Sequence, residues 1–162
     1  MYSVTHAVEV QAARTKVWRR LADLEDGWNP VFSSSRMVGS PPRGVGARRE
    51  SRLAGEDGHL HERVVEWEDG RWMTTEVTDT SLPIASAKMV LGVEPCGESS
   101  TTVVFVLEYE PRRDALSRFG GVLVLRARLC KLVHRMADGL KRAVEEASAP
   151  SALAGRPLPL AK

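Results

Sequence analysis

One long amphipathic segment near the C-terminal end limits the folds open to this chain more than any other feature. Between about Arg112 and Ala147, apolar side chains recur every three or four residues, the period of an α-helix with one apolar face. The stripe consists of Leu125, Leu129, Leu132, Val133, Met136, Leu140 and Val144. A single helix of that length would measure roughly 50 Å. Because residues 148–162 offer little to cover the stripe, it predicts a broad sheet, formed by the preceding residues, against which the helix packs.

The residues before this helix have the alternation and the turn signals of such a sheet. Apolar and polar residues alternate in the first strand, and Gly55-Glu56-Asp57-Gly58 and Asp69-Gly70 are typical hairpin turns. The expected strands are Ser3–Gln11, Ser33–Gly39, Val45–Ala54, His59–Glu68, Arg71–Asp79, Ile84–Glu94 and Thr101–Glu110, and the expected short helices after the first strand are Arg14–Asp23 and Leu24–Pro30. This order predicts an α+β fold in which a seven-stranded antiparallel sheet curls around the long C-terminal helix.

Length predicts the number of domains, and charge and hydropathy limit the kinds of partner that the chain can have. A chain of 162 residues is one domain by length, which we place at residues 1–147, and residues 148–162, with three prolines, are expected to form a flexible tail. The net charge of +2 and the mixing of arginines with glutamates argue against a nucleic-acid surface. The sequence has no run of eighteen apolar residues, so we expect no stable membrane insertion.

The cysteines and the first residues suggest a compartment. Cys96 and Cys130 have neither the spacing of metal ligands nor a disulfide framework around them, so free thiols in a reducing compartment are expected. The first ten residues alternate and lack the apolar core of a signal peptide. Both observations predict a cytoplasmic protein.

The N-terminal third carries residues that resemble a known superfamily. The pattern includes a strand ending in Val-x-Val, a small-residue break and a tryptophan-asparagine-proline turn. Its members here are Val8, Val10, Val17, Trp18, Leu21, Asp23, Trp28, Asn29 and Pro30, followed by Gly44-Val45-Gly46 and Val64-x-Glu66-Trp67. Together with the long helix, they resemble the START-like helix-grip (SRPBCC) superfamily, which includes polyketide cyclase/dehydrase and lipid-transport proteins. The resemblance covers residues 3–147 and implies a hydrophobic cavity between the sheet and the long helix.

Hairpin geometry predicts which side chains face that cavity, because cross-strand partners share a face. A two-residue turn at Asp69-Gly70 pairs Glu62 with Val77, Val64 with Thr75 and Glu66 with Met73. The turn after Ala54 pairs Ser51 with Glu62, Arg49 with Val64 and Glu50 with Arg63. One face would then carry the charged ladder Glu50, Arg63 and Glu76, which suits a solvated outer surface.

The opposite face becomes the expected ligand-binding face. The strand residues predicted to lie there are Arg49, Ser51, Leu53, Leu60, Glu62, Val64, Met73, Thr75 and Val77. The expected ligand-binding set is Arg49, Ser51, Glu62, Val64, Met73, Thr75, Phe105, Leu107, Phe119 and Leu123. An inward Arg49–Glu62 pair has two interpretations: both side chains reach water at a cavity rim, or Arg49 anchors a ligand carbonyl, hydroxyl or carboxylate. Gly120-Gly121 within the long helix likewise indicates either a kink, or room for a ligand or a mobile gate.

The candidates for acid–base chemistry are His6, Glu62 and Tyr109. His6 shares the apolar face of the first strand, and its ordinary pKa suits proton transfer if it opens onto the cavity. His59 and His61 share a strand face, but no third ligand is evident in the sequence, so we expect no metal. We expect no cofactor.

Two functions fit this pattern. The first is binding of a hydrophobic small molecule, such as a lipid, polyketide or isoprenoid, by a monomer or homodimer. The alternative is a polyketide cyclase or dehydratase that uses acid–base chemistry in the same cavity. The small number of interior polar residues favours binding.

Overall fold

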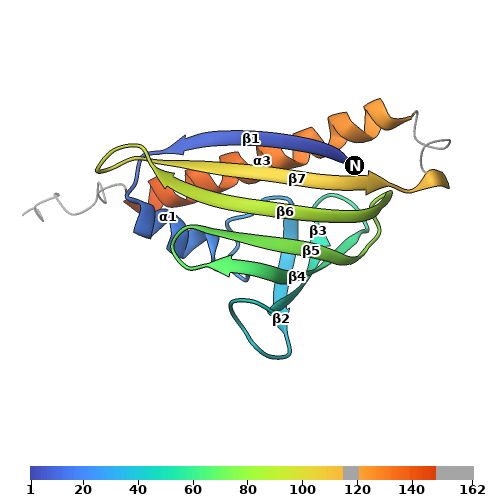
Figure 1. Ribbon diagram of the computed structural model, residues 1–162, viewed down its shortest axis with the longest axis horizontal. Helices are drawn as coiled ribbons and strands as arrows, with labels where there is room; N and C mark the ends of the chain where they lie inside the picture. Colours follow the sequence, from blue (N-terminus) through green and yellow to red (C-terminus); the bar gives the residue numbers. More distant parts are fainter. Residues whose placement is uncertain (115–120, 149–162) are drawn as a thin grey trace, which may run out of the picture.

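The computed structural model describes residues 1–114 and 121–148 of the chain. One seven-stranded antiparallel sheet, in the order β1-β7-β6-β5-β4-β3-β2, packs against a long helix (Figure 1). The strands are β1 (Tyr2–Val10), β2 (Phe32–Val38), β3 (Arg48–Leu53), β4 (His59–Glu68), β5 (Trp72–Thr80), β6 (Ile84–Pro95) and β7 (Thr101–Pro111), and the helices are α1 (Arg14–Leu21) and α3 (Val122–Ser148). The predicted α+β class and curled antiparallel sheet are confirmed.

The first strand lies at one edge of the sheet, next to the last strand. Strands β2 to β7 follow one another as neighbours, while β1 pairs with β7 along its whole length. Every second residue of β7 from Val103 to Tyr109 is buried, as expected for a strand with one covered face. Helix α3 runs along β1 and β7 and supplies that cover (Figure 1).

Helix α3 has the predicted apolar stripe, but it does not begin where the sequence predicted. Buried positions recur from Leu125 to Val144 with the predicted period. The helix begins at Val122 rather than at Arg112, and Gly121 has φ +91°, a value that an α-helix does not contain. The prediction of one uninterrupted helix is therefore wrong. Apolar periodicity does not reveal such a break, because glycine adopts positive φ without changing the pattern around it.

The prediction of a second short helix at Leu24–Pro30 is also wrong. These residues form bends and turns, in which Leu24, Trp28 and Asn29 are nevertheless buried. The Asn29 side-chain oxygen accepts a hydrogen bond from the Val31 amide at 3.0 Å. A local side-chain bond of this kind stabilises a turn in place of a helix.

The hairpin between β3 and β4 has the predicted faces but a different register. Arg49 lies opposite Glu62, not opposite Val64, and Glu50 lies opposite His61. The two-residue difference leaves every side chain on its predicted face, because the side-chain period of a strand is two. The predicted Glu50–Arg63 step of the charged ladder is consequently absent, and Glu50 pairs with Arg36 at 2.6 Å.

Two bulges interrupt the predicted register between β4 and β5. The pairs Glu62–Val77 and Val64–Thr75 are as predicted. The register shift between His61 and Glu62 adds one residue, Thr78, to β5, and the shift between Val64 and Glu66 adds one residue, Val65, to β4. The predicted Glu66–Met73 pair is therefore wrong, because Glu66 lies opposite Thr74. Bulges of this kind increase the local twist, which suits a sheet that curls.

Helix α3 approaches the turns before β2 closely at Gly139. A β-carbon at this position would lie 2.3 Å from Pro30 Cδ and 2.8 Å from the Trp28 carbonyl oxygen. The absence of a side chain thus permits direct contact between the helix backbone and these turns. This contact lies in the C-terminal half of α3.

Other expectations concern the thiols and the chain beyond the domain. Cys96 is exposed and Cys130 half-buried, and both are free, as predicted. Across residues 1–114 and 121–148, no helix has the length and apolar character that spanning a bilayer requires. Ser148 still belongs to α3, and the rest of the predicted tail lies outside the described residues.

Candidate functional site

Three buried polar side chains, Arg49, Glu62 and Thr75, join β3, β4 and β5 and form what we call the inner cluster. Arg49 Nη2 and Nε donate to Glu62 Oε2 at 2.5 and 3.1 Å. Thr75 Oγ1 donates to Glu62 Oε1 at 3.0 Å. Arg49 and Glu62 are each 7% exposed. Both oxygens of the buried carboxylate therefore have a donor.

Arg49 has further partners in the turns before β2 and at the start of β2. Its Nη1 donates to the Leu24 carbonyl oxygen at 3.2 Å, and its Cζ lies 4.9 Å from the centroid of the Phe32 ring. A buried charge costs several kcal/mol unless it is paired and hydrogen-bonded, and these contacts supply that compensation. The interpretation in which both charges reach water at a rim is wrong, because neither side chain is appreciably exposed.

An apolar cavity of about 60 Å³ lies between the sheet and α3. Sheet residues and α3 residues contribute to its wall, and Glu62 is the one ionisable residue among the described residues that line it. The lining consists of Val31, Phe32, Leu53, Leu60, Glu62, Val77, Leu82, Ile84, Ala87, Met89, Leu107, Leu129, Leu132, Val133 and Met136. The cavity therefore touches the inner cluster at Glu62.

Part of the lining is accessible to solvent. Phe32, Leu60, Val77, Met89 and Leu132 are half-buried, whereas the other lining residues are buried. These half-buried apolar side chains are the parts of the wall that solvent reaches. They come from β2, β4, β5, β6 and α3.

The predicted ligand-binding residues fall into four groups. Glu62 and Leu107 line the cavity. Leu123 is 81% exposed, so the expectation that it lines the cavity is wrong; it precedes the buried stripe of α3. Phe119 lies outside the described residues. The predicted residues that are buried without lining the cavity are Arg49, Ser51, Val64, Met73, Thr75 and Phe105.

Of the acid–base candidates, only Glu62 touches the cavity. His6 packs edge-on against His134 of α3, with ring centroids 4.1 Å apart, and does not line the cavity. Burial and the neighbouring His134 hold the pKa of His6 below its ordinary value. Tyr109 is buried beside Tyr2, and its hydroxyl has no hydrogen-bond partner among the described residues. Burial raises the pKa of Tyr109.

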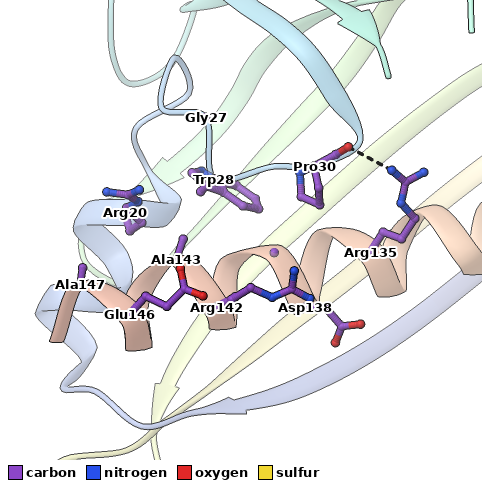
Figure 2. A pocket seen from close by; sticks show the side chains of 11 residues that line it. Arg20, Gly27, Trp28, Pro30, Arg135, Asp138, Arg142, Ala143, Glu146 and Ala147 are labelled. Carbon is purple, nitrogen blue, oxygen red and sulfur yellow. Dashed lines mark hydrogen bonds between the residues drawn. The ribbon is translucent and has the colours of Figure 1, made fainter. Parts of the chain in front are cut away.

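A larger hollow of about 700 Å³ lies between α3 and the turns at Gly27–Pro30 (Figure 2). Figure 2 shows the charged side chains of α3, among them Arg135 and Arg142, on one side and Trp28 and Pro30 on the other. Arg135 Nη2 donates to the Pro30 carbonyl oxygen at 3.1 Å. This hollow is open and charged, so it does not suit an apolar ligand.

A third hollow, of about 850 Å³, lies where β2, β3, β4 and β5 adjoin. Its lining includes His59 and His61 and also Asp79, which the hairpin arithmetic did not place beside them. We call His59, His61 and Asp79 the outer cluster. The structure thus brings a third potential metal ligand to the two histidines.

Sequence reasoning missed much of the cavity wall. Val31, Leu82, Ile84, Ala87 and Met89 were not among the predicted site residues. The sequence predicted a strand at Ile84–Glu94, but the position of its residues beside the cavity depends on how the sheet curls. The helix stripe was the useful signal, because Leu129, Leu132, Val133 and Met136 belong to it.

Comparison with known proteins agrees with this architecture. A family model described as polyketide cyclase/dehydrase and lipid transport matches residues 1–145. No significant match was found among curated proteins.

Solved structures with the same fold come from distant sequences. The Zhui aromatase/cyclase of a Streptomyces species superposes with a TM-score of 0.80 at 16% identity, covering 93% of this chain and 98% of that one. A START superfamily protein from Mycobacterium smegmatis gives a TM-score of 0.70 at 19% identity, with coverage of 91% and 99%. Norcoclaurine synthase from Thalictrum flavum gives 0.65 at 17% identity, with coverage of 90% and 87%. These likenesses establish the fold.

Proposed function

Since this chain belongs to the polyketide cyclase/dehydrase and lipid transport family, we propose that it binds a hydrophobic small molecule between the sheet and α3. The observation that carries the proposal is a cavity whose described wall residues are all apolar except Glu62. Such a wall suits a lipid, polyketide or isoprenoid-like molecule with one or two oxygen functions. Apolar burial would supply most of the affinity, at about 25 cal/mol per Å².

Binding requires the cavity to enlarge. Its volume of about 60 Å³ is well below the roughly 300–1,000 Å³ of ligand pockets. Met89 and Met136 lie in the wall, and methionine side chains adapt readily to different shapes. Because Met89 is among the half-buried lining residues, its side chain has solvent on one side into which it can move.

Glu62 suggests the kind of oxygen function on the ligand. An ionised carboxylate is an acceptor with about four lone-pair sites, and Arg49 and Thr75 leave part of that capacity unused. A ligand hydroxyl would therefore find an acceptor at the cavity wall. This differs from the expectation that Arg49 donates to a ligand carbonyl, since Arg49 does not line the cavity.

A matched pair of substitutions on β6 tests the proposal. Ala87→Leu places additional carbon atoms in the cavity, whereas Ala85→Leu makes the same change at an exposed position of the same strand. We expect at least tenfold weaker binding of an apolar fluorescent fatty acid for Ala87→Leu, and unchanged binding for Ala85→Leu. Thermal unfolding of each variant verifies that it folds. Equal affinities for the two folded variants would contradict the proposal.

The alternative, a polyketide cyclase or dehydratase, is favoured by one observation, the position of Glu62 in the cavity wall. Glu62→Gln separates the two functions. With a poly-β-keto thioester analogue, an enzyme would lose turnover in this variant while retaining the analogue. A carrier would bind the analogue and leave it unchanged, both in the natural chain and in the variant. Mass spectrometry of the purified protein would identify any molecule that copurifies with it.

A further inference from the structure

The outer cluster lies on the face of the sheet opposite the cavity. His59 and His61 are two residues apart on β4, and His61 lies opposite Asp79 of β5. Their side chains are between 37% and 60% exposed. The alternation of strand residues places neighbouring Leu60 and Glu62 at the cavity and the histidines on the other side.

Several hydrogen bonds fix the backbone that carries these side chains. The His59 amide donates to Ser81 Oγ at 2.9 Å, and Thr80 Oγ1 donates to the His59 carbonyl oxygen at 3.0 Å. Thr78 Oγ1 donates to the His61 carbonyl oxygen at 3.2 Å. The three side chains of the cluster therefore extend from a backbone that is held in place on both strands.

The donor atoms converge on a small volume. His59 Nε2 lies 2.9 Å from Asp79 Oδ2, and His61 Nδ1 lies 3.7 Å from the same oxygen. One ligand atom from each of the three residues falls within 4.8 Å of the others. Two ligands bound to one ion at about 2.1 Å are separated by roughly 3.0–3.4 Å at angles between 90° and 109°. Small rotations of exposed side chains would bring all three atoms to that spacing.

The types of donor indicate which ions fit. Two imidazoles and one carboxylate suit zinc and neighbouring first-row ions, whereas magnesium and calcium prefer sites made entirely of oxygen. The surrounding hollow adds Glu50 and Asp57 to Asp79, against the guanidinium groups of Arg36 and Arg52. Three carboxylates against two guanidinium groups leave the hollow with an excess of negative charge.

We propose that His59, His61 and Asp79 form a binding site for one divalent first-row transition-metal ion of the zinc class. The three side chains approach from the sheet, so the remaining coordination positions face solvent and would hold water. A bound ion would link the beginning of β4 to the end of β5, on the face away from the cavity. The site is therefore independent of ligand binding beside α3.

Zinc titration of the purified chain, in the presence of a reducing agent, tests the site. We expect isothermal titration calorimetry to give one equivalent of bound Zn²⁺ and no measurable binding of Mg²⁺. Loss of a residue that merely supports a metal ligand typically costs 10–100-fold in affinity. His59→Ala, His61→Ala and Asp79→Asn should therefore each weaken zinc binding at least tenfold. The midpoint of thermal unfolding should rise with zinc in the natural chain and not in these variants.

Control variants address the other places where zinc could bind. His134→Ala removes one of the two imidazole rings that are in contact at His6 and His134, and Cys96→Ser removes the exposed thiol. Both should bind zinc like the natural chain. The proposal would be overturned by absence of zinc binding at millimolar concentration, by undiminished binding in all three cluster variants, or by loss of binding in a control.

Discussion

Strands β3, β4 and β5 carry charged and polar side chains on both faces, and the two faces differ in how these groups are satisfied. In the inner cluster, every oxygen of the carboxylate has a protein donor and water has little access. In the outer cluster, one carboxylate oxygen is shared between two exposed histidines. The comparison teaches that a buried charged group needs protein partners that pair with its charge and its hydrogen-bonding atoms. An exposed group can instead keep donor atoms available for a partner.

The largest expected effect comes from removing the cation of the inner cluster. Arg49→Met leaves Glu62 buried without its counter-charge, so the free energy of unfolding should fall by about 3–5 kcal/mol. Urea denaturation measures this loss. The double variant Arg49→Met/Glu62→Leu should recover much of it, because no unpaired charge remains.

An arginine on the outer face provides the control. Arg36 pairs with Glu50 at 2.6 Å and is 75% exposed, so Arg36→Met should leave the free energy of unfolding nearly unchanged. If Arg36→Met and Arg49→Met destabilised the chain equally, the contrast between the faces would be lost.

An intermediate effect on the free energy of unfolding is expected from removing the Thr75 hydroxyl. Thr75→Val removes the donor to Glu62 Oε1 and should lower the free energy of unfolding by about 1–3 kcal/mol, since a buried charged acceptor loses a hydrogen bond. Thr78→Val makes the same change at an exposed position of β5 and should cost clearly less. Chemical denaturation of both variants measures the difference. A cost at Thr78 that equals or exceeds the cost at Thr75 would speak against this account.

The smallest effect concerns titration of the outer cluster. A hydrogen bond from His59, followed by the charges of both histidines, keeps the pKa of Asp79 below its ordinary value. His59→Ala should raise that pKa toward the ordinary value, and His134→Ala should not, as carboxyl carbon NMR titration would detect. Because the folded pKa is lowered, any stability from this contact is present above the unfolded pKa and is lost as the pH falls through the folded value. An unchanged Asp79 pKa in His59→Ala would refute the assigned cause.

The sequence patterns predicted the face of the sheet on which a side chain lies better than they predicted its partner on the neighbouring strand. The hairpin arithmetic placed Arg49 and Glu62 on the interior side although the register between β3 and β4 differs by two residues, because an even shift preserves the face. Without the bulge in β5, His61 would lie opposite Thr78, and Asp79 would point to the interior. The shift between His61 and Glu62 brings Asp79 to His61 instead. Bulges depend on the twist of the whole sheet, so hairpin turns alone do not reveal them.

The contact at Gly139 bears on how the cavity can enlarge. Around it, Arg135 bonds to the Pro30 carbonyl, Lys141 to the Glu9 carbonyl, and Glu145 to the Gln11 amide. This half of α3 is therefore attached to its surroundings along its length. The cavity-lining Leu129 lies about 15 Å along the helix axis from Gly139.

In the other half of α3, Arg128 forms an ion pair with Glu56 at 2.5 Å, and the two side chains are 38% and 41% exposed. If the C-terminal half is held more firmly, the helix behaves as a rigid rod whose displacement grows with distance from Gly139. A tilt of about 10° at Gly139 would move the helix axis at Leu129 by about 2.6 Å, at 1.5 Å per residue. The same tilt would move the helix axis at Arg135, about 6 Å from Gly139, by only about 1 Å. We therefore expect a bound molecule to shift the N-terminal half of α3 away from the sheet, with the amplitude increasing from Met136 toward Leu125.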